Sequence, residues 1–205
     1  MVKSYYIKAY CKIQNESVVL NEKSIFHTKE QGFDRFAKEA YKTLAVSYPK
    51  FFKMDHLSKL AFLTADCILK DEKINPEDPS NIALLFANRA SSLDTDRKHQ
   101  ESIQDKSNYF PSPAVFVYTL PNICLGEISI KYKLYTENSF FIFDNFQPEN
   151  LMTYAKGLLD SEKAEEVLCG WVEYDEDHYE SFLYLVSKEG RFEHTEDNIL
   201  KLYNA

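Results

Sequence analysis

The run SFFIFDN at residues 139–145 is followed by PENLMTYAKGLL at 148–159 and by EVLCGWV at 166–172. Short apolar runs bounded by polar residues are typical of buried strands, and a proline suits the first turn of a helix. The stretch therefore predicts a strand, a turn at Asp144 and Asn145, a helix and a second strand. Such a strand-helix-strand unit is the building block of parallel sheets.

The rest of the chain continues this alternation of strands and helices. The further predicted elements are strands at 4–12, 82–87 and 179–188, helices at 31–47, 54–70, 118–133 and 195–202, and a polar, helix-permissive segment at 94–106. Residues 18–26 fit either a hairpin partner of the first strand or a loop. Asp55 is placed to cap the helix at 54–70, and Pro121 falls in the first turn of the helix at 118–133. Together these elements predict an α/β fold of approximately βαβαβαββ order, with helices layered on a largely parallel sheet.

Length and charge narrow the class of protein. The chain has 205 residues, which fits one domain with a sizeable core. Its formal net charge of −8 argues against a general nucleic-acid binder, which needs a basic surface. Apolar runs stay well below the roughly 18 residues that a membrane-spanning helix requires. The alternating N-terminus is typical of a strand and not of a signal peptide, so we expect a cytoplasmic protein.

The cysteine and histidine positions give no sign of a metal or cofactor site. The four cysteines are Cys11, Cys67, Cys124 and Cys169. They are far apart in apolar surroundings, so we expect buried thiols in a reducing compartment. Acidic residues flank His178, and Asp94 and Asp96 precede His99, but solvated polar loops explain both groups. His56 has no evident partner, and we expect neither a metal nor a cofactor.

Three segments carry a resemblance to a known family. They are FFKMDHLSKLAFLTA at 51–65, IALLFANRASSLDTD at 82–96 and the stretch from 110 to 172, in which TLPNICLGEISI at 119–130 is the most specific. In order and spacing they resemble the N-terminal half of the β-ketoacyl-ACP synthases, which have the thiolase fold. The likeness is greatest to the short synthase-like proteins of bacterial aryl-polyene and flexirubin-type pigment clusters. It implies a single β-ketoacyl synthase N-terminal-like domain over residues 1–205.

The resemblance places Asn145 where the family has its nucleophilic cysteine. Counting forward from TEN at 136–138 and back from AKGLL at 155–159 gives the same position, and no cysteine lies from 125 through 168. Condensation needs a thiolate, whose pKa the N-terminus of the following helix lowers, and an amide cannot replace it. The family's second catalytic pair, His/His or His/Asn, comes from a C-terminal half that these residues do not include. We therefore expect no 3-oxoacyl-ACP synthase activity.

The strand predicted at 139–143 is rich in phenylalanine. Both faces of this strand are apolar, so both must be covered. Core packing within the chain explains the pattern, and so does pairing with the strand of a second chain, as in thiolase-fold dimers; we favour the second explanation. The candidates for contact with a partner, or for the wall of an acyl tunnel, are Leu120, Ile123, Phe140, Phe141 and Phe143.

Three functions remain open at this point. The first is a non-catalytic accessory subunit, similar to a chain-length factor, in fatty-acid-like or polyene and polyketide biosynthesis. Its partner is expected to be a ketosynthase subunit or a second copy of the chain, with acyl carrier protein as a further candidate. The second is a small enzyme that processes acyl thioesters with Asn145 and Asp144, through activated water or a polarised carbonyl. The third is a ligand-binding protein that has kept the fold.

Overall fold

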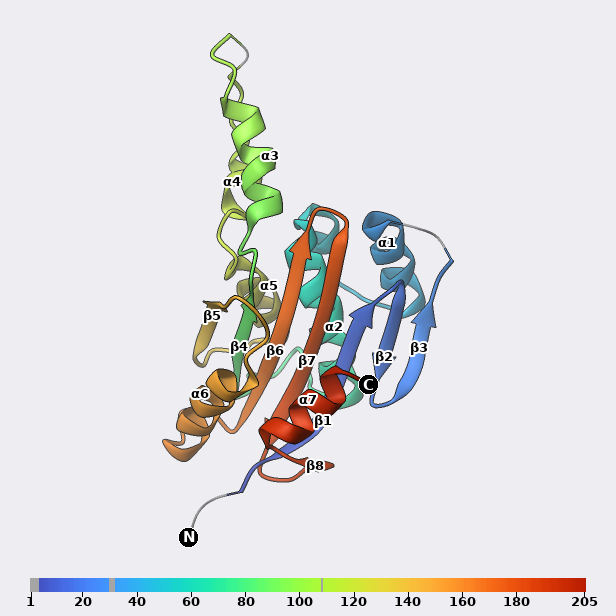
Figure 1. Ribbon diagram of the computed structural model, residues 1–205, viewed down its shortest axis with the longest axis vertical. Coiled ribbons are helices and arrows are strands. Elements are labelled where there is room, and N and C mark those ends of the chain that lie inside the picture. Colours follow the sequence, from blue (N-terminus) through green and yellow to red (C-terminus); the bar gives the residue numbers. More distant parts are fainter. Residues whose placement is uncertain (1–3, 30–31, 108) are drawn as a thin grey trace.

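The computed structural model describes residues 4–29, 32–107 and 109–205, which form a mixed eight-stranded sheet with helices on both faces (Figure 1). The strands are β1 (Tyr6–Gln14), β2 (Ser17–Leu20), β3 (Lys23–His27), β4 (Ile82–Asn88), β5 (Asn138–Ile142), β6 (Glu166–Asp175), β7 (His178–Ser187) and β8 (Phe192–Glu193). The helices are α1 (Phe33–Thr43), α2 (His56–Asp71), α3 (Leu93–Ile103), α4 (Pro113–Val117), α5 (Ile123–Tyr132), α6 (Pro148–Asp160) and α7 (Glu196–Tyr203), with a 3-10 helix η1 (Pro49–Lys53) before α2. None of these helices is both long and apolar enough to cross a bilayer.

The strands lie in the order β3-β2-β1-β7-β6-β4-β5, and β8 pairs with the start of β1. Strand β4 is parallel to both of its neighbours, β5 and β6. Strand β7 runs antiparallel to β6 and to β1. The core strands β1, β4, β5, β6 and β7, with the helices that connect them, confirm the predicted βαβαβαββ order.

The sheet is less parallel than predicted. The turn between β6 and β7 contains only residues 176 and 177, too short for the crossover that a parallel pair needs. Residues 18–26, for which the sequence leaves hairpin and loop open, form most of β2 and β3, a hairpin that extends the sheet beyond β1. The prediction of a largely parallel sheet is therefore wrong: among the described strands, parallel ladders are confined to β4 and its two neighbours.

Two apolar layers enclose the centre of the sheet. On one face α2 packs against β1, β6 and β7, with α1 and α5 beside it. On the other face α6 packs against β4 and β6, and α7 packs against α6. Strand β4 lies between these layers and is buried at every position. This burial explains its continuous apolar sequence, since a strand covered on both faces needs no polar alternation.

Residues 89–107 and 109–122, which we call the arm, project beyond the carboxyl end of β4 (Figure 1). Helix α3 runs out along the arm and α4 lies beside it. The prediction of one helix over 118–133 is wrong, because Ser112 and Pro113 start α4 earlier and α5 begins only at Ile123. The break at Tyr118 lets its hydroxyl reach the buried carboxylate of Glu127, at 3.1 Å.

Gly170 in β6 lies in close contact with the backbone of β7. A methyl group at this position would lie 2.0 Å from the carbonyl oxygen of Phe182 and 2.9 Å from Cα of Leu183. We expect Gly170→Ala to lower the free energy of unfolding by about 1–3 kcal/mol, because β6 and β7 must separate to admit it.

Gly157→Ala is the matched control for this substitution. A methyl group at Gly157 in α6 meets nothing within 4 Å, so alanine is expected to stabilise the protein by about 0.5–1 kcal/mol. Urea unfolding of both variants measures the difference. A Gly170→Ala protein as stable as the wild type would contradict this packing.

Candidate functional site

The segment after β5 has the predicted form of strand, turn and helix. Phe143 extends the ladder to β4 by donating its N–H to the carbonyl oxygen of Asn88, at 2.9 Å. Asp144 and Asn145 then form an exposed bend, and α6 begins at Pro148. The proline fixes the start of the helix there, because the N–H that it lacks would have no partner in the first turn.

A pocket of about 170 Å³, which we call the strand-end pocket, opens at the carboxyl ends of β4, β5 and β6. In open α/β sheets, ligands bind in the crevice outside the carboxyl ends of the strands. Its lining residues are Arg89, Asp144, Asn145, Phe146, Trp171, Glu173, His178, Glu180 and Tyr203. A larger pocket of about 320 Å³ lies beside β1, β2 and the end of α7, and its lining does not include the turn.

Glu173 forms the buried acidic wall of the strand-end pocket. It lies near the end of β6 and is 3% exposed. Its Oε2 accepts hydrogen bonds from the backbone N–H groups of Arg89 (2.7 Å) and Ala90 (3.4 Å), which fixes the turn after β4. Its Oε1 is buried without a hydrogen-bond partner among the described residues. Burying a carboxylate oxygen without a hydrogen-bond donor is unfavourable. The unpaired Oε1 therefore indicates that Glu173 has a functional role in this pocket.

Aromatic rings form another wall of the pocket. The ring centre of Phe146 lies 4.7 Å from that of Tyr203 and 6.1 Å from that of Trp171. Glu180 fixes two of these rings, because its Oε1 accepts hydrogen bonds from Nε1 of Trp171 (3.1 Å) and from the hydroxyl of Tyr203 (3.0 Å). Burial, with Glu180 beside it, raises the pKa of Tyr203. The phenol therefore stays protonated and donates to Glu180 at neutral pH.

Asn145 lies in the bend between β5 and α6, and the pocket beside it is small. Its side chain is exposed and makes no hydrogen bond to any described residue. Pockets for drug-sized ligands measure about 300–1,000 Å³, so the strand-end pocket is too small to enclose a long acyl chain by itself. The sequence prediction omitted the pocket residues Glu173, Trp171 and Tyr203. The signal for Glu173 is a lone carboxylate inside the apolar run VLCGWVEY at 167–174.

All four thiols are buried, which confirms the prediction for the cysteines. Cys124 lies in α5, and burial raises its pKa well above the ordinary value. Cys169 lies in β6, and burial raises its pKa as well. Because the thiolate is the reactive form, neither residue is suited to act as a nucleophile at neutral pH.

The acidic groups near His178 and His99 do not assemble a metal site. Among the described residues, no group of three or more His, Cys, Asp and Glu side chains is placed to hold a metal ion. His178 is exposed beside the turn before β7, as predicted. The prediction of a polar loop at Asp94, Asp96 and His99 is wrong, because all three lie in α3. The two carboxylates occupy the first turn, where they stabilise the N-terminus of the helix.

A cluster of polar side chains fixes the base of the arm to the body. His56, for which the sequence shows no partner, contacts Oδ1 of Asp34 in α1 (3.3 Å) and Oδ2 of Asp94 in α3 (3.1 Å). Asp55 caps α2, as predicted, and also accepts a hydrogen bond from the hydroxyl of Thr95 at 2.9 Å. The partners of these α2 residues come from α1 and α3, which is why the sequence alone did not connect them.

Strand β5 forms one edge of the sheet, so one side of it has no neighbouring strand among the described residues. Phe140 packs with the core on the α2 face, whereas Phe141 and Phe143 pack on the α6 face. The two faces are therefore both apolar, as predicted. Ile142 on the same strand is 51% exposed.

Exposed apolar side chains gather on the elements near this edge. Most of them lie on the arm, α5, β5 and α6, which occupy one side of the molecule (Figure 1). They include Tyr109, Phe110, Phe116, Val117, Leu120, Ile130, Tyr135, Ile142 and Tyr154. Of the predicted contact residues outside the strand, Leu120 is exposed and Ile123 is half-buried against the core.

The fold matches solved structures of ketosynthases and chain length factors. The ishigamide ketosynthase/chain length factor has a TM-score of 0.65 at 13% identity, over 90% of this chain and 62% of that chain. The ketosynthase ApeO in complex with its chain length factor ApeC, from Xenorhabdus doucetiae, gives 0.58 at 12% identity, over 91% and 80%. The AntDE:AntF complex, a type II polyketide synthase acyl-carrier protein with its ketosynthase, gives 0.61 at 12% identity, over 99% and 66%.

The chain therefore has the thiolase-like fold of the ketosynthases, as the sequence resemblance predicts. It spans about 62% of the length of the ishigamide protein that it matches. No protein-family model and no curated protein matches its sequence. At 12–13% identity the likeness establishes the fold, so the function has to be argued from the site itself.

The contacts at the base of the arm predict a dependence of stability on pH. Burial alone would raise the pKa of Asp94, but hydrogen bonds from His56 and Lys98 outweigh it and hold the pKa below the ordinary value of 3.8. A carboxyl group with a lowered pKa stabilises the fold above its ordinary pKa and loses this contribution as the pH falls through the folded value.

We therefore expect Asp94→Asn to destabilise the protein at neutral pH and to have less effect in acid. Urea unfolding of the wild type and the variant at about pH 7 and about pH 3 measures both differences. A difference that does not change with pH would show that the ionised carboxylate is not the stabilising species.

Proposed function

We propose that this chain is a non-catalytic ketosynthase homologue that acts as an accessory subunit, in the manner of a chain-length factor. The turn after β5 carries the proposal: strand, turn and helix are retained, and Asn145 stands where the resemblance puts the nucleophilic cysteine. An amide does not take up an acyl group as a thioester, and the four thiols are buried elsewhere. The subunit would serve fatty-acid-like or polyene and polyketide biosynthesis.

The proposed partner is a ketosynthase subunit, docked at the edge strand β5. An open strand edge presents unpaired N–H and C=O groups, to which another strand can bind. The exposed apolar side chains near this edge, such as Ile142, would be buried in the same contact. Two of the structural neighbours are a ketosynthase with its chain length factor and an acyl-carrier protein with its ketosynthase. A second copy of this chain is the alternative partner, and acyl carrier protein is a further one.

The size of the strand-end pocket supports a shared acyl tunnel. About 170 Å³ is too little to enclose a long acyl chain, so a tunnel would need walls from both subunits. Phe141 and Phe143 are half-buried beside the open edge and are the proposed contribution of this chain. Leu120 would reach the partner from the arm.

A second candidate function is a small enzyme that processes acyl thioesters. One observation favours it: Glu173, with an unpartnered carboxylate oxygen, lines the same pocket as Asp144 and Asn145. A carboxylate can act as a general base toward water, and an amide N–H can stabilise an oxyanion. Hydrolysis of short acyl thioesters that Glu173→Gln abolishes would support this enzyme over the accessory subunit.

Introducing a cysteine at the turn tests whether this position can activate a thiol. We expect the wild type to show no condensation with acyl and malonyl carrier protein. Asn145→Cys places a thiol just before α6, where the helix N-terminus lowers its pKa. Gly157→Cys, exposed in the C-terminal half of α6 where an added Cβ meets nothing within 4 Å, is the matched control.

Iodoacetamide should alkylate the new thiol at position 145 about three- to tenfold faster than that at position 157 near pH 7, because more of it is thiolate. The four buried thiols should react more slowly than both. Equal rates at the two new cysteines would mean that the turn does not provide a nucleophile position, and condensation by the wild type would overturn the proposed role.

The docking edge can be tested with two added lysines at opposite ends of the sheet. Ile142→Lys puts a charge on the exposed face of β5 and is expected to weaken association with the partner at least about tenfold. Ser24→Lys adds the same charge to the exposed edge strand β3 and should leave association unchanged.

Light scattering and native mass spectrometry of the protein purified from its source measure association. A co-purifying ketosynthase, lost only in Ile142→Lys, is the expected result. A monomer without a partner, or an equal loss in both variants, would contradict docking at β5.

A further inference from the structure

We propose that the strand-end pocket binds the head group of an organic cation, a primary or methylated ammonium, with Glu173 as its anionic contact. This inference goes beyond the accessory role and does not depend on it. Three features of the pocket support it: a buried carboxylate oxygen without a donor, a wall of aromatic rings, and an excess of acidic over basic side chains.

The orientation of the Glu173 carboxylate leaves one oxygen for a ligand. Two backbone N–H groups of the turn after β4 hold Oε2, so the group cannot rotate without losing these bonds. Oε1 is thereby kept in the pocket wall, buried and without a donor among the described residues. Burying a carboxylate oxygen without a partner is unfavourable, whereas a charged N–H donor makes a strong hydrogen bond with it. An ammonium group supplies that donor and the compensating charge.

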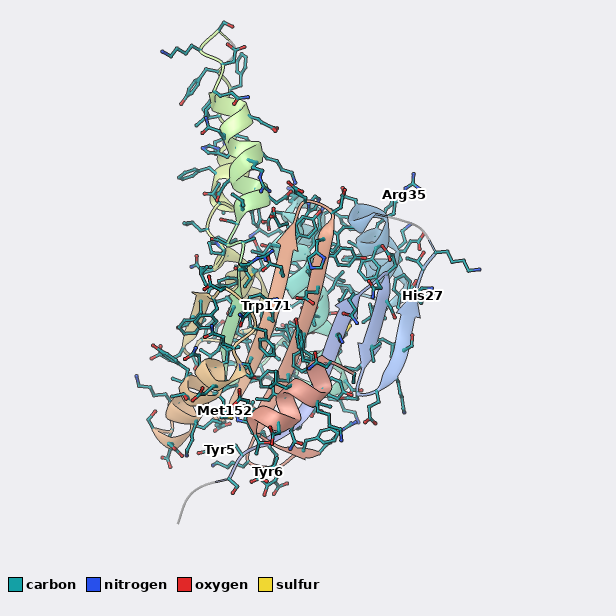
Figure 2. All side chains as sticks on the ribbon, viewed as in Figure 1. Tyr5, Tyr6, His27, Arg35, Met152 and Trp171 are labelled. Carbon is teal, nitrogen blue, oxygen red and sulfur yellow. The ribbon has the colours of Figure 1, made fainter. Side chains whose placement is uncertain are left out.

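The aromatic wall suits the same kind of ligand. A cation within about 6 Å of a ring centre is attracted to the face of the ring, and tryptophan is the strongest partner. Trp171 projects from β6 on the face of the sheet that α6 and α7 cover (Figure 2). Phe146 and Tyr203 lie next to it, and Glu180 holds the Trp171 and Tyr203 side chains in place. The same ring faces repel an anion.

The charges around the pocket favour a cation as well. The lining carboxylates are Asp144, Glu173 and Glu180, and the lining guanidinium is Arg89, whose side chain is exposed at the rim. A metal ion fits poorly, because the described residues offer no group of three ligands. A volume of about 170 Å³ admits a small head group and excludes larger molecules.

Two sources share this chemistry. One is a free alkylammonium compound, and the other is the side chain of a lysine on a second protein. The test therefore uses probes of both kinds, each with an N–H donor: n-butylammonium chloride, trimethylammonium chloride and Nα-acetyl-lysine methylamide. Sodium chloride and sodium butyrate serve as controls for ionic strength and for an anion of similar size.

Trp171 provides a direct fluorescence signal for ligand binding in the pocket. It is the only tryptophan in the chain and it lines the pocket, so its fluorescence reports occupancy without a label. We expect a saturable change with the cations at about millimolar concentration, the strength that one charged contact and little buried area provide. Butyrate and sodium chloride should give no saturable change.

Three variants assign the binding to the pocket. Glu173→Gln keeps an oxygen that can accept from the N–H groups of the turn but removes the charge, and is expected to weaken binding at least about tenfold. Glu149→Gln removes one carboxylate from the exposed first turn of α6, outside the pocket, and should leave binding unchanged. Phe146→Leu removes one ring and should weaken binding about threefold, which provides a second test if Glu173→Gln does not fold.

The outcomes separate the two sources and the two proposals. Tighter binding of butylammonium or trimethylammonium than of the lysine amide assigns the site to a free compound, and the reverse order assigns it to a protein side chain. Absence of a saturable change with every cation, an equal response to butyrate, or unchanged binding by folded Glu173→Gln overturns the inference. The accessory role is tested separately, by condensation and by association at β5.

Discussion

The burial of β4 on both faces is the constraint on which the structure depends. A strand without an exposed face needs a helical layer on each side and a neighbour along each edge, and α2, α6, β5 and β6 provide them. Because both neighbours are parallel to β4, three carboxyl ends meet at one end of the sheet. The turn after β4, the bend at Asn145 and the side chain of Glu173 are brought together there, although they are distant in the sequence.

The sequence predicted those elements whose signals are local. The apolar run of β5, the proline at the start of α6 and the Asp55 cap each depend on neighbouring residues, and all three are confirmed. The helix predicted at 118–133 begins only at Ile123, because Tyr118 ends the preceding helix and its hydroxyl contacts a glutamate in α5. The partners of His56 come from α1 and α3, and no spacing within one helix reveals them.

The candidate site was predicted only in part, for the same reason. The position of Asn145 follows from counting within one segment, so the sequence located it. The pocket beside it combines residues from the turn after β4, from β6 and β7, and from α7, whose proximity depends on the order of strands in the sheet. Glu173 carries a local signal, since a lone carboxylate in an apolar strand is unusual. Its unpaired oxygen depends on two backbone groups more than eighty residues away in the chain.

The arm differs from the rest of the molecule in how little of it is buried. Thr95 is the buried residue of α3, and α4 has none, whereas β4 is buried throughout. Substitutions beyond the base of the arm therefore change few contacts that stabilise the fold. Selection for folding leaves this segment free to vary, while β4 and α2 remain restricted. The arm could therefore accumulate substitutions one at a time, each of them nearly neutral for folding.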